Sequence, residues 1–489
     1  AHGLDTRVEG AGVSICPGPN MAYYDKLISM TDMIGHIYGR KNIISRTDRP
    51  HMFVKELNLY IDYLKGKVGD ASKSPTVKEQ KYLTMFAENL EEGINYYFNL
   101  LENDVKNITD ASTVIKSEFE NISKECDNCI NVFFQSNFVK KGTNQRIIKD
   151  VNVVNVVAIQ KGTKYPNRYI IMSGDIDSRA SDTMDFTTDA PGANDNASGM
   201  AGTIEAARVL SKYKFENSII YVGLSGEEQG LFGGAGLAKY AKEHSWEIIG
   251  ILNNDMIGNI TGVDGVIDNR SFRIFSEPVP ANETERQRRM RRFYGGEVDG
   301  ISRQLARYVH KNVKTYMPEM NPMMIYRLDR FGRGGHHRPF NDLGFAGIRI
   351  MEAHENYTQQ HQDIRTENGI KYGDTFEHVN FGYAKKLTAV NAINLASLAW
   401  APPSPKEVAI GGIVQASAKL KWNKVQGAKG YKIYWRDTTS PTWDHSRYIE
   451  TTEFTLEGIV IDNFFFGVSA VGENGIESVV VFPNKIWRK

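Results

Sequence analysis

Between residues 151 and 398 the chain alternates between two patterns of apolar residues. Short runs rich in valine and isoleucine, typical of buried strands, are followed by longer segments with apolar residues at helical spacing. The short runs predict strands at 151–159, 168–172, 218–224, 248–253 and 346–351, and the longer segments predict helices at 198–210, 233–243, 298–312 and 383–398. This alternation favours an α/β fold, in which a mostly parallel mixed sheet is covered by helices on both faces.

The chain of 489 residues is long enough for two or three domains. Residues 20 to about 125 carry apolar positions at helical spacing and predict a helical N-terminal segment packed on the sheet domain. Clustered prolines between Trp400 and Pro405 mark a linker near the other end. We therefore predict three parts: a helical segment at 1–130, the α/β domain at 131–401 and a small domain at 402–489.

The residues after the linker form short alternating patterns typical of strands, at 418–422, 430–435, 453–456 and 464–471. Such a segment fits a small β-sandwich. With Trp422 on an early strand and a Tyr-x-Ile-Tyr-Trp strand ending at Trp435, it resembles a fibronectin type III domain. Its sequence contains no group of residues typical of catalysis, so we expect a spacer or interaction role.

The charge balance excludes some partners. The 59 basic and 58 acidic residues give a net charge of +1, so no overall field draws the chain to nucleic acid or an anionic membrane. The basic cluster Arg286–Arg292 is short and isolated, and we expect it on a solvated helix or loop. No run approaches the ~20 apolar residues of a membrane span. The sequence does not indicate an oligomeric state.

Cysteine use is sparse, with 3 in the chain. Cys126 and Cys129 form a C-x-x-C pair, and Cys16 lies far away in sequence. Because a structural zinc site needs four ligands, we expect either a local disulfide or two plain thiols at this pair.

Acidic residues mark one predicted edge of the sheet. Asp195, Glu228 and Asp255 each lie where an apolar run meets a glycine-rich turn. The carboxyl ends of strands in an open α/β sheet bind ligands, and carboxylates gathered there need a cation such as a divalent metal to offset their repulsion. Glu227 neighbours a ligand candidate but points elsewhere, which leaves it free to move a proton. Metals that lower the pKa of water beside a carboxylate base indicate a hydrolase.

The order and spacing of these motifs resemble those of the co-catalytic zinc aminopeptidases, whose superfamily also includes glutaminyl cyclases and glutamate carboxypeptidases. The resemblance covers residues from about 140 to 400 and rests on Gly174–Ser178, Pro191–Gly199, Ser225–Gly234 and Asn254–Gly258. It implies a zinc-exopeptidase fold with catalytic function for residues 131–401. It also implies two metals bridged by Asp195, with Glu228 on one metal, Asp255 on the other and Glu227 as the general base.

The resemblance further implies a histidine ligand near the end of the catalytic domain. His361 is the favoured candidate, because it lies in a polar loop after the predicted strand at 346–351. His354 and His378 are the alternatives.

One position departs from the family pattern. Relatives begin with His-x-Asp-Ser, whose histidine binds the metal shared with Asp255, whereas this chain has Asp175-Ile-Asp177-Ser178. Asp175 would then be a metal ligand. Asp177 would orient the metal ligands without binding the metal itself. An all-oxygen ligand set favours cations harder than zinc. We therefore predict one firm zinc on the His361 side and a weaker second site for zinc or a harder divalent cation.

Two residues are predicted to bind substrate. His337 takes the position of a family histidine that would face the cleft, or else it orders its loop. Tyr357 lies in the loop that leads to the predicted histidine ligand. The neighbouring arginines Arg330, Arg333 and Arg338 could hold a substrate carboxylate, which would favour a carboxypeptidase-like specificity.

The sequence thus predicts a metal-dependent exopeptidase, with an aminopeptidase favoured, acting on a peptide or protein. Two alternatives stay open. One is a catalytically weak metal-binding or scaffold protein, suggested by Asp175 and the added segments. The other is a glutaminyl cyclase, which uses similar ligands on one zinc without hydrolysis. A secreted or bacterial periplasmic location is expected by analogy, since fibronectin-like modules and metallo-exopeptidases commonly occur together outside the cytoplasm.

Overall fold

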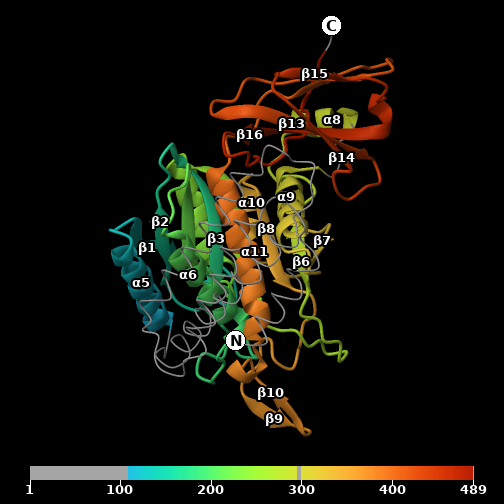
Figure 1. The fold of residues 1–489 in the computed structure, drawn as a ribbon. Coiled ribbons are helices and arrows are strands. Elements are labelled where there is room, and N and C mark those ends of the chain that lie inside the picture. The colour runs from blue at the N-terminus through green and yellow to red at the C-terminus, as the bar shows by residue number, and fades with distance from the viewer. Residues whose placement is uncertain (1–107, 295–298, 488–489) are drawn as a thin grey trace, which may run out of the picture.

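The computed structural model describes residues 108–294 and 299–487. Its centre is an eight-stranded mixed sheet in the order β1-β2-β4-β3-β5-β8-β6-β7 (Figure 1). The strands are β1 Ile130–Val139, β2 Val151–Gln160, β3 Tyr165–Asp175, β4 Asn217–Leu224, β5 Glu247–Asn254, β6 Ser271–Ser276, β7 Asn321–Ile325 and β8 Gly347–Glu352. The inner strands β4, β3, β5 and β8 run parallel, so their carboxyl ends share one edge.

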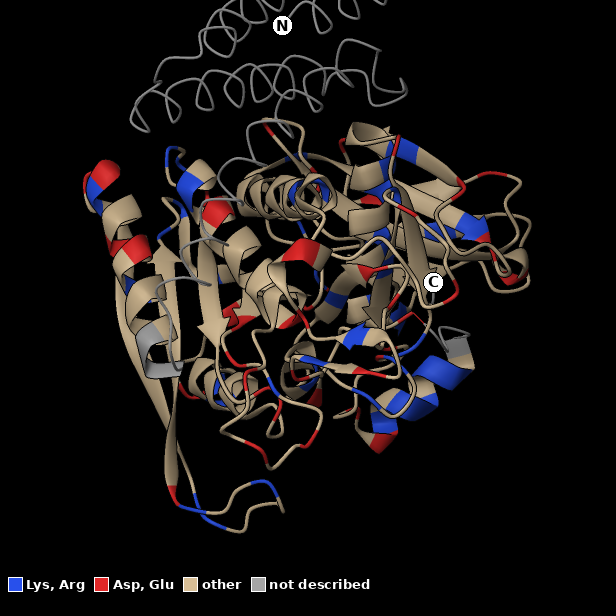
Figure 2. Cartoon of the chain, turned by 90° about the horizontal axis from the view of Figure 1, so that it is seen from below, with Lys and Arg blue, Asp and Glu red and all other residues tan. Residues whose placement is uncertain are grey.

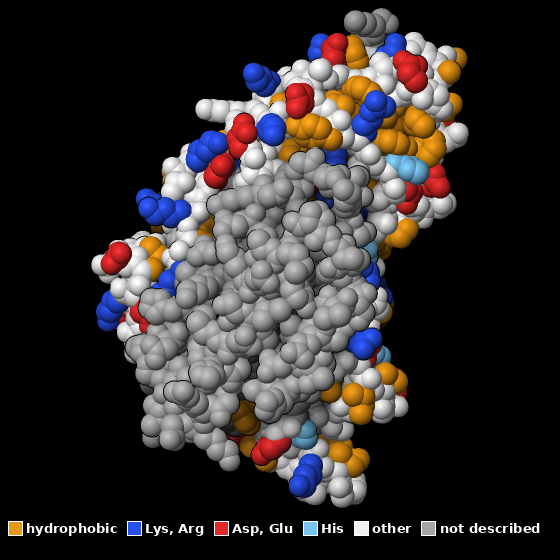
Figure 3. All heavy atoms as spheres, in the orientation of Figure 1, with side chains coloured by type: hydrophobic (Ala, Val, Ile, Leu, Met, Phe, Trp, Pro, Cys, Tyr) orange, Lys and Arg blue, Asp and Glu red, His pale blue; other side chains and the backbone are white. Residues whose placement is uncertain are grey.

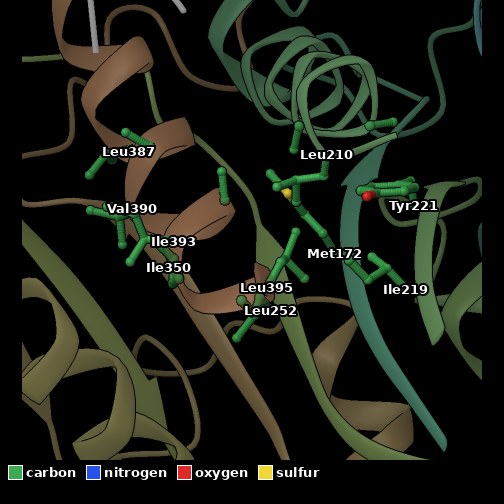
Figure 4. Packing of buried hydrophobic residues seen from close by; sticks show 14 of the residues in the cluster. Met172, Leu210, Ile219, Tyr221, Leu252, Ile350, Leu387, Val390, Ile393 and Leu395 are labelled. Carbon is green, nitrogen blue, oxygen red and sulfur yellow. The ribbon is translucent and has the colours of Figure 1, made fainter. Parts of the chain in front are cut away.

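Helices cover both faces of this sheet, as predicted. On one face pack α5 Ile108–Glu125, α6 Gly199–Leu210, α9 Ile301–Tyr316 and α11 Phe381–Trp400, and on the other pack α7 Phe232–Glu243 and α10 His337–Asp342. Figure 4 shows Met172, Leu252 and Ile350 of the sheet facing the same interior as Val390 and Ile393 of α11. Strands buried on both faces are apolar almost throughout, which explains why β4 and β8 were evident in the sequence.

The part of the N-terminal segment that the structure describes is α5. Helix α5 ends just before a disulfide between Cys126 and Cys129, which is one of the two states predicted for this pair. The remainder of the helical segment predicted at 1–130 lies outside the described residues.

The C-terminal part contains two sheets that share a core. One has the order β15-β12-β11-β17 and the other β14-β13-β16 (red in Figure 1). The strands are β11 Ala409–Gly411, β12 Ala418–Lys421, β13 Ala428–Asp437, β14 His445–Ile449, β15 Glu453–Leu456, β16 Phe464–Gly472 and β17 Lys485–Ile486. Trp422 and Tyr431 meet edge to face inside this core. Two packed sheets fit the predicted β-sandwich, while the likeness to fibronectin type III and the boundary at 402 stay predictions.

Polar contacts fix these C-terminal sheets against α9. The carboxylate of Glu477 lies 2.8 Å from Nζ of Lys311 on α9 and 3.0 Å from Nζ of Lys432 on β13. Burial would raise the pKa of Glu477, but the two ammonium groups hold it below its ordinary value. The hydroxyl of Tyr308 donates to the backbone oxygen of Glu477 at 3.0 Å. On the surface of these C-terminal sheets in Figure 3, charged side chains of both signs are interspersed with hydrophobic ones.

The remaining elements are short. They are the π-helix Ala193–Ser198, the helix α8 Glu285–Tyr294, the hairpin β9 Arg365–Glu367 with β10 Ile370–Tyr372, and the 3-10 turns Phe376–His378 and Ile461–Asn463. Helix α8 carries the basic cluster, mostly exposed as expected, and appears as a blue helix in Figure 2. Among the helices that the structure describes, none has the length and apolar character needed to cross a bilayer.

Candidate active site

A cleft of about 670 Å³ opens at the carboxyl ends of the central parallel strands. Its lining includes Glu227 and Glu228, which follow β4, and Asp255, which follows β5. Asp195 of the π-helix and His361 of the loop after β8 complete the set of predicted residues in the lining. Segments far apart in the chain therefore bring four carboxylates and one imidazole to a single edge of the sheet, as the sequence predicted.

Three of these side chains converge closely enough to hold one metal ion. Nε2 of His361 lies 3.0 Å from Oδ2 of Asp195 and 2.9 Å from Oε1 of Glu228. One ligand atom from each residue falls within 4.8 Å of the others. Two carboxylates and an imidazole are the kind of three-ligand set that catalytic zinc uses, with a fourth position left for water or substrate. The residues present therefore fit a single zinc ion.

The electrostatics of this three-residue cluster favour a cation. Burial would lower the pKa of His361, but Asp195 and Glu228 raise it to about 9. Asp374 holds Asp195 in place, because the backbone N–H of Asp195 donates a hydrogen bond to the carboxylate of Asp374 at 2.7 Å. Gln360 donates to Oδ2 of Asp195 at 3.2 Å. These surrounding contacts orient the ligands before any ion binds.

We predict that His361→Ala lowers the zinc content of the purified protein from about one ion per chain to nearly none, because three protein ligands are the minimum of a catalytic zinc site. The matched control is His378→Ala, which removes an exposed histidine that was one of the two alternative ligand candidates. Metal analysis after desalting measures both variants. Equal zinc in the two variants would remove His361 from the ligand set.

Asp177 positions the glutamate pair. Its carboxylate accepts hydrogen bonds from the backbone N–H groups of Glu227 at 3.1 Å and of Glu228 at 3.0 Å. Burial raises the pKa of Asp177 to about 6. Burial raises the pKa of Glu227 well above its ordinary value, and the negative charge of Asp255 raises it further. A carboxylate of raised basicity beside a metal-binding cluster is suited to accept a proton from water.

The residues predicted for a second metal do not converge on a common point. Asp175 is engaged through both oxygens: Oδ1 lies 2.6 Å from Nδ1 of His336, and Oδ2 accepts from Nδ2 of Asn196 at 2.8 Å. Burial raises the pKa of Asp175 to about 8 and lowers that of His336 to about 4. Oδ1 of Asp255 lies 2.8 Å from Nη2 of the buried Arg349. Asp175 is thus hydrogen-bonded within the protein, whereas Asp255 is paired with Arg349 by charge and its Oδ1 accepts no hydrogen bond from the described residues. Because the guanidinium already supplies the positive charge here, the donor set does not fit a second metal bridged by Asp195.

Sequence reasoning missed His336 and Arg349. A signal for Arg349 was present, because it interrupts the apolar strand Gly-Ile-Arg-Ile-Met. An arginine in a central strand needs carboxylate partners inside the protein. His336 is next to His337, the residue that matches the family position. Nothing in the local sequence indicates which of the two histidines faces Asp175.

The two predicted substrate-binding residues lie elsewhere. His337 is fully buried, its Nε2 donates to the backbone oxygen of Leu328 at 2.8 Å, and its backbone N–H donates to Oδ1 of Asn253. It therefore orders the loop and does not face the cleft, which corrects the substrate-binding role predicted for it. Tyr357 is 55% exposed and is not part of the cleft lining. Its predicted contact with substrate is not supported by this position.

Arginines form the rest of the polar lining: Arg146, Arg179, Arg330, Arg333 and Arg338. Arg179 holds the ligand Glu228, with Nε 3.3 Å from Oε2, and Arg330 pairs with Glu355 at 2.9 Å. Arg333 and Arg338 form no ion pair with a carboxylate of residues 108–294 or 299–487.

Sequence comparison places this arrangement in a family. The model of the family described as Peptidase family M28 matches residues 155–390. A probable zinc metalloprotease of Pyrenophora tritici-repentis is 36% identical over 385 residues, which cover 78% of this chain and 89% of that protein. The chain belongs to peptidase family M28. A probable zinc metalloprotease of Pyrenophora teres f. teres is 38% identical, with 81% of this M28 chain and 84% of the relative covered.

Solved structures also resemble this M28 protein. The LapA aminopeptidase of Legionella pneumophila is 17% identical, with a TM-score of 0.44, and the match covers 67% of this chain and 77% of that chain. The match to the family model and the similarity to the fungal relatives confirm the predicted resemblance at the level of peptidase family M28. Membership of a peptidase family implies a peptide or protein substrate.

Proposed function

We propose that this M28 protein is a zinc-dependent exopeptidase that removes residues from the amino end of peptides. The observation that carries the proposal is the convergence of Asp195, Glu228 and His361 in the cleft that Glu227 also lines. The names of the fungal relatives support zinc as the metal. The motifs resembling those of the co-catalytic aminopeptidases favour attack at the amino end.

The residues of the cleft have distinct parts in peptide hydrolysis. Asp195, Glu228 and His361 would hold the zinc ion, which would supply a Lewis acid to activate water and polarise the substrate carbonyl. Glu227 takes the proton from the attacking water and passes it to the departing amine. Asp177 keeps Glu227 and Glu228 in a fixed relation by accepting from both backbone N–H groups. Arg179 restrains the carboxylate of Glu228 through an ion pair.

A set of peptides with blocked ends tests the exopeptidase proposal. We expect stepwise loss of single residues from a peptide with a free amino end, no reaction after N-acetylation and little effect of C-terminal amidation. Mass spectrometry of the products follows each step. Internal fragments would show an endopeptidase instead, and a loss of ammonia from an N-terminal glutamine without loss of a residue would show a glutaminyl cyclase.

A second candidate is a carboxypeptidase, favoured by the guanidinium groups of Arg333 and Arg338. Neither forms an ion pair within the described part of the chain, and both line the cleft. A substrate α-carboxylate is a matching partner for arginine. The same peptides distinguish this candidate, because amidation would then abolish the reaction and N-acetylation would not.

For the cellular setting we propose a secreted or periplasmic location. The Cys126–Cys129 disulfide supports it, because disulfides persist mainly in oxidising compartments. The C-terminal sheets would then act as a spacer or interaction module.

A further inference from the structure

We infer that the guanidinium group of Arg349 takes the place of a second metal ion, so that this M28 protein loads one divalent cation per chain. The inference rests on the zinc site proposed above and concerns the neighbouring position. The family resemblance implies that Asp175, Asp195 and Asp255 share a second cation there. In this chain a side chain of the protein supplies the positive charge.

Arg349 is fixed in this position by its strand and by its partners. It lies on β8, where its backbone pairs with Asn253 of β5, and its side chain is fully buried. Nη2 lies 2.8 Å from Oδ1 of Asp255. Nη1 lies 3.2 and 3.3 Å from the two carboxylate oxygens of Asp329 and donates to the backbone oxygen of Gly334 at 2.6 Å. Strand pairing and contacts on two sides leave the guanidinium little freedom to withdraw.

Asp175 is also committed to partners within the protein. One oxygen contacts Nδ1 of His336 at 2.6 Å, and the other accepts from Nδ2 of Asn196 at 2.8 Å. Both partners are buried, as Asp175 is. A metal at this carboxylate would have to displace a buried hydrogen bond whose donor would then have no acceptor.

Electrostatics exclude a second ion from the same position. An arginine remains charged at every working pH, and a divalent cation beside it meets direct repulsion in a poorly solvated site. An ion that took over Asp255 would also leave a buried guanidinium short of a counter-charge. It follows that Asp195 binds the single zinc as a terminal ligand and does not bridge two ions.

Metal stoichiometry tests this inference. The full chain is stripped with chelator, exposed to excess Zn²⁺, Mn²⁺ or Co²⁺ in separate samples, desalted and analysed for metal. We expect about one zinc per chain, with no second ion at higher concentration. Asp255→Asn should keep that one ion, whereas Glu228→Gln should lower occupancy at least several-fold. Two ions in the wild type, one of them lost in Asp255→Asn, would overturn the inference and leave the proposed peptidase function standing.

A spectroscopic measurement covers the case in which Asp255→Asn fails to fold. Two Co²⁺ ions that share a carboxylate couple magnetically, whereas a lone Co²⁺ gives an uncoupled paramagnetic signal. We expect the uncoupled signal from the wild-type chain at every loading of Co²⁺. A coupled signal overturns the assignment of Arg349. Failure to bind any ion would instead contradict the proposed zinc-dependent function.

Discussion

Replacing Glu227 with glutamine should lower kcat by about 10²- to 10⁴-fold, the contribution typical of general acid–base catalysis. Glutamine keeps the size of the side chain but cannot accept a proton from water. Because Glu227 is not one of the three converging ligands, the zinc content of Glu227→Gln should remain that of the wild type. Steady-state kinetics on an unblocked peptide and metal analysis of the same sample measure both quantities.

The adjacent residue provides the matched control. Glu228→Gln makes the same chemical change one position along the chain, but at a residue whose Oε1 lies 2.9 Å from Nε2 of His361. This variant should lose zinc and activity together. Wild-type turnover in Glu227→Gln, or loss of zinc from it, would show that Glu227 has a different role.

Replacing Arg349 with methionine should lower the free energy of unfolding by about 3–5 kcal/mol, the usual cost of removing one partner from a buried ion pair. The change leaves Asp255 and Asp329 inside the protein without their guanidinium partner. Burial alone would lower the pKa of Arg349, but these two carboxylates raise it above its ordinary value. Urea unfolding followed by circular dichroism measures the difference.

Arg333→Met serves as the control for this stability effect. Arg333 belongs to the same cleft but is exposed and forms no ion pair among the described residues. Exposed substitutions of this kind usually change stability by no more than about 0.5 kcal/mol. If both variants unfolded at the same urea concentration, the buried ion pairs of Arg349 would contribute no net stability.

Most elements of the catalytic domain could be predicted because its central strands are buried on both faces. The helix predicted at 233–243 appears as α7 at Phe232–Glu243, and the strand predicted at 346–351 appears as β8. Weaker signals were missed. Strand β7 has five residues and contains Pro322, a residue that argues against a strand when read from sequence alone.

The metal-binding cluster was predictable because Asp195 and Glu228 lie in motifs of recognisable order and His361 lies in a polar loop after a predicted strand. The role of Arg349 was not, because it depends on strand order. Strand β8 pairs with β5 in the sheet although roughly ninety residues separate them in the chain, and only that pairing brings Arg349 to Asp255. His336 and His337 show the same limit at shorter range. The start of α10 turns the first toward Asp175 and the second toward Leu328.

The attachment of the C-terminal sheets to α9 bears on any attempt to shorten this protein. Helix α9 packs Leu305 and Val309 into the main core, while the hydroxyl of Tyr308 and the ammonium of Lys311 contact residues of the sheets beyond residue 402. A chain that ends after the proline linker would therefore leave Lys311 without its partner Glu477 and expose the part of α9 that contacts the C-terminal sheets. Engineers seeking a minimal catalyst would have to redesign that helix first.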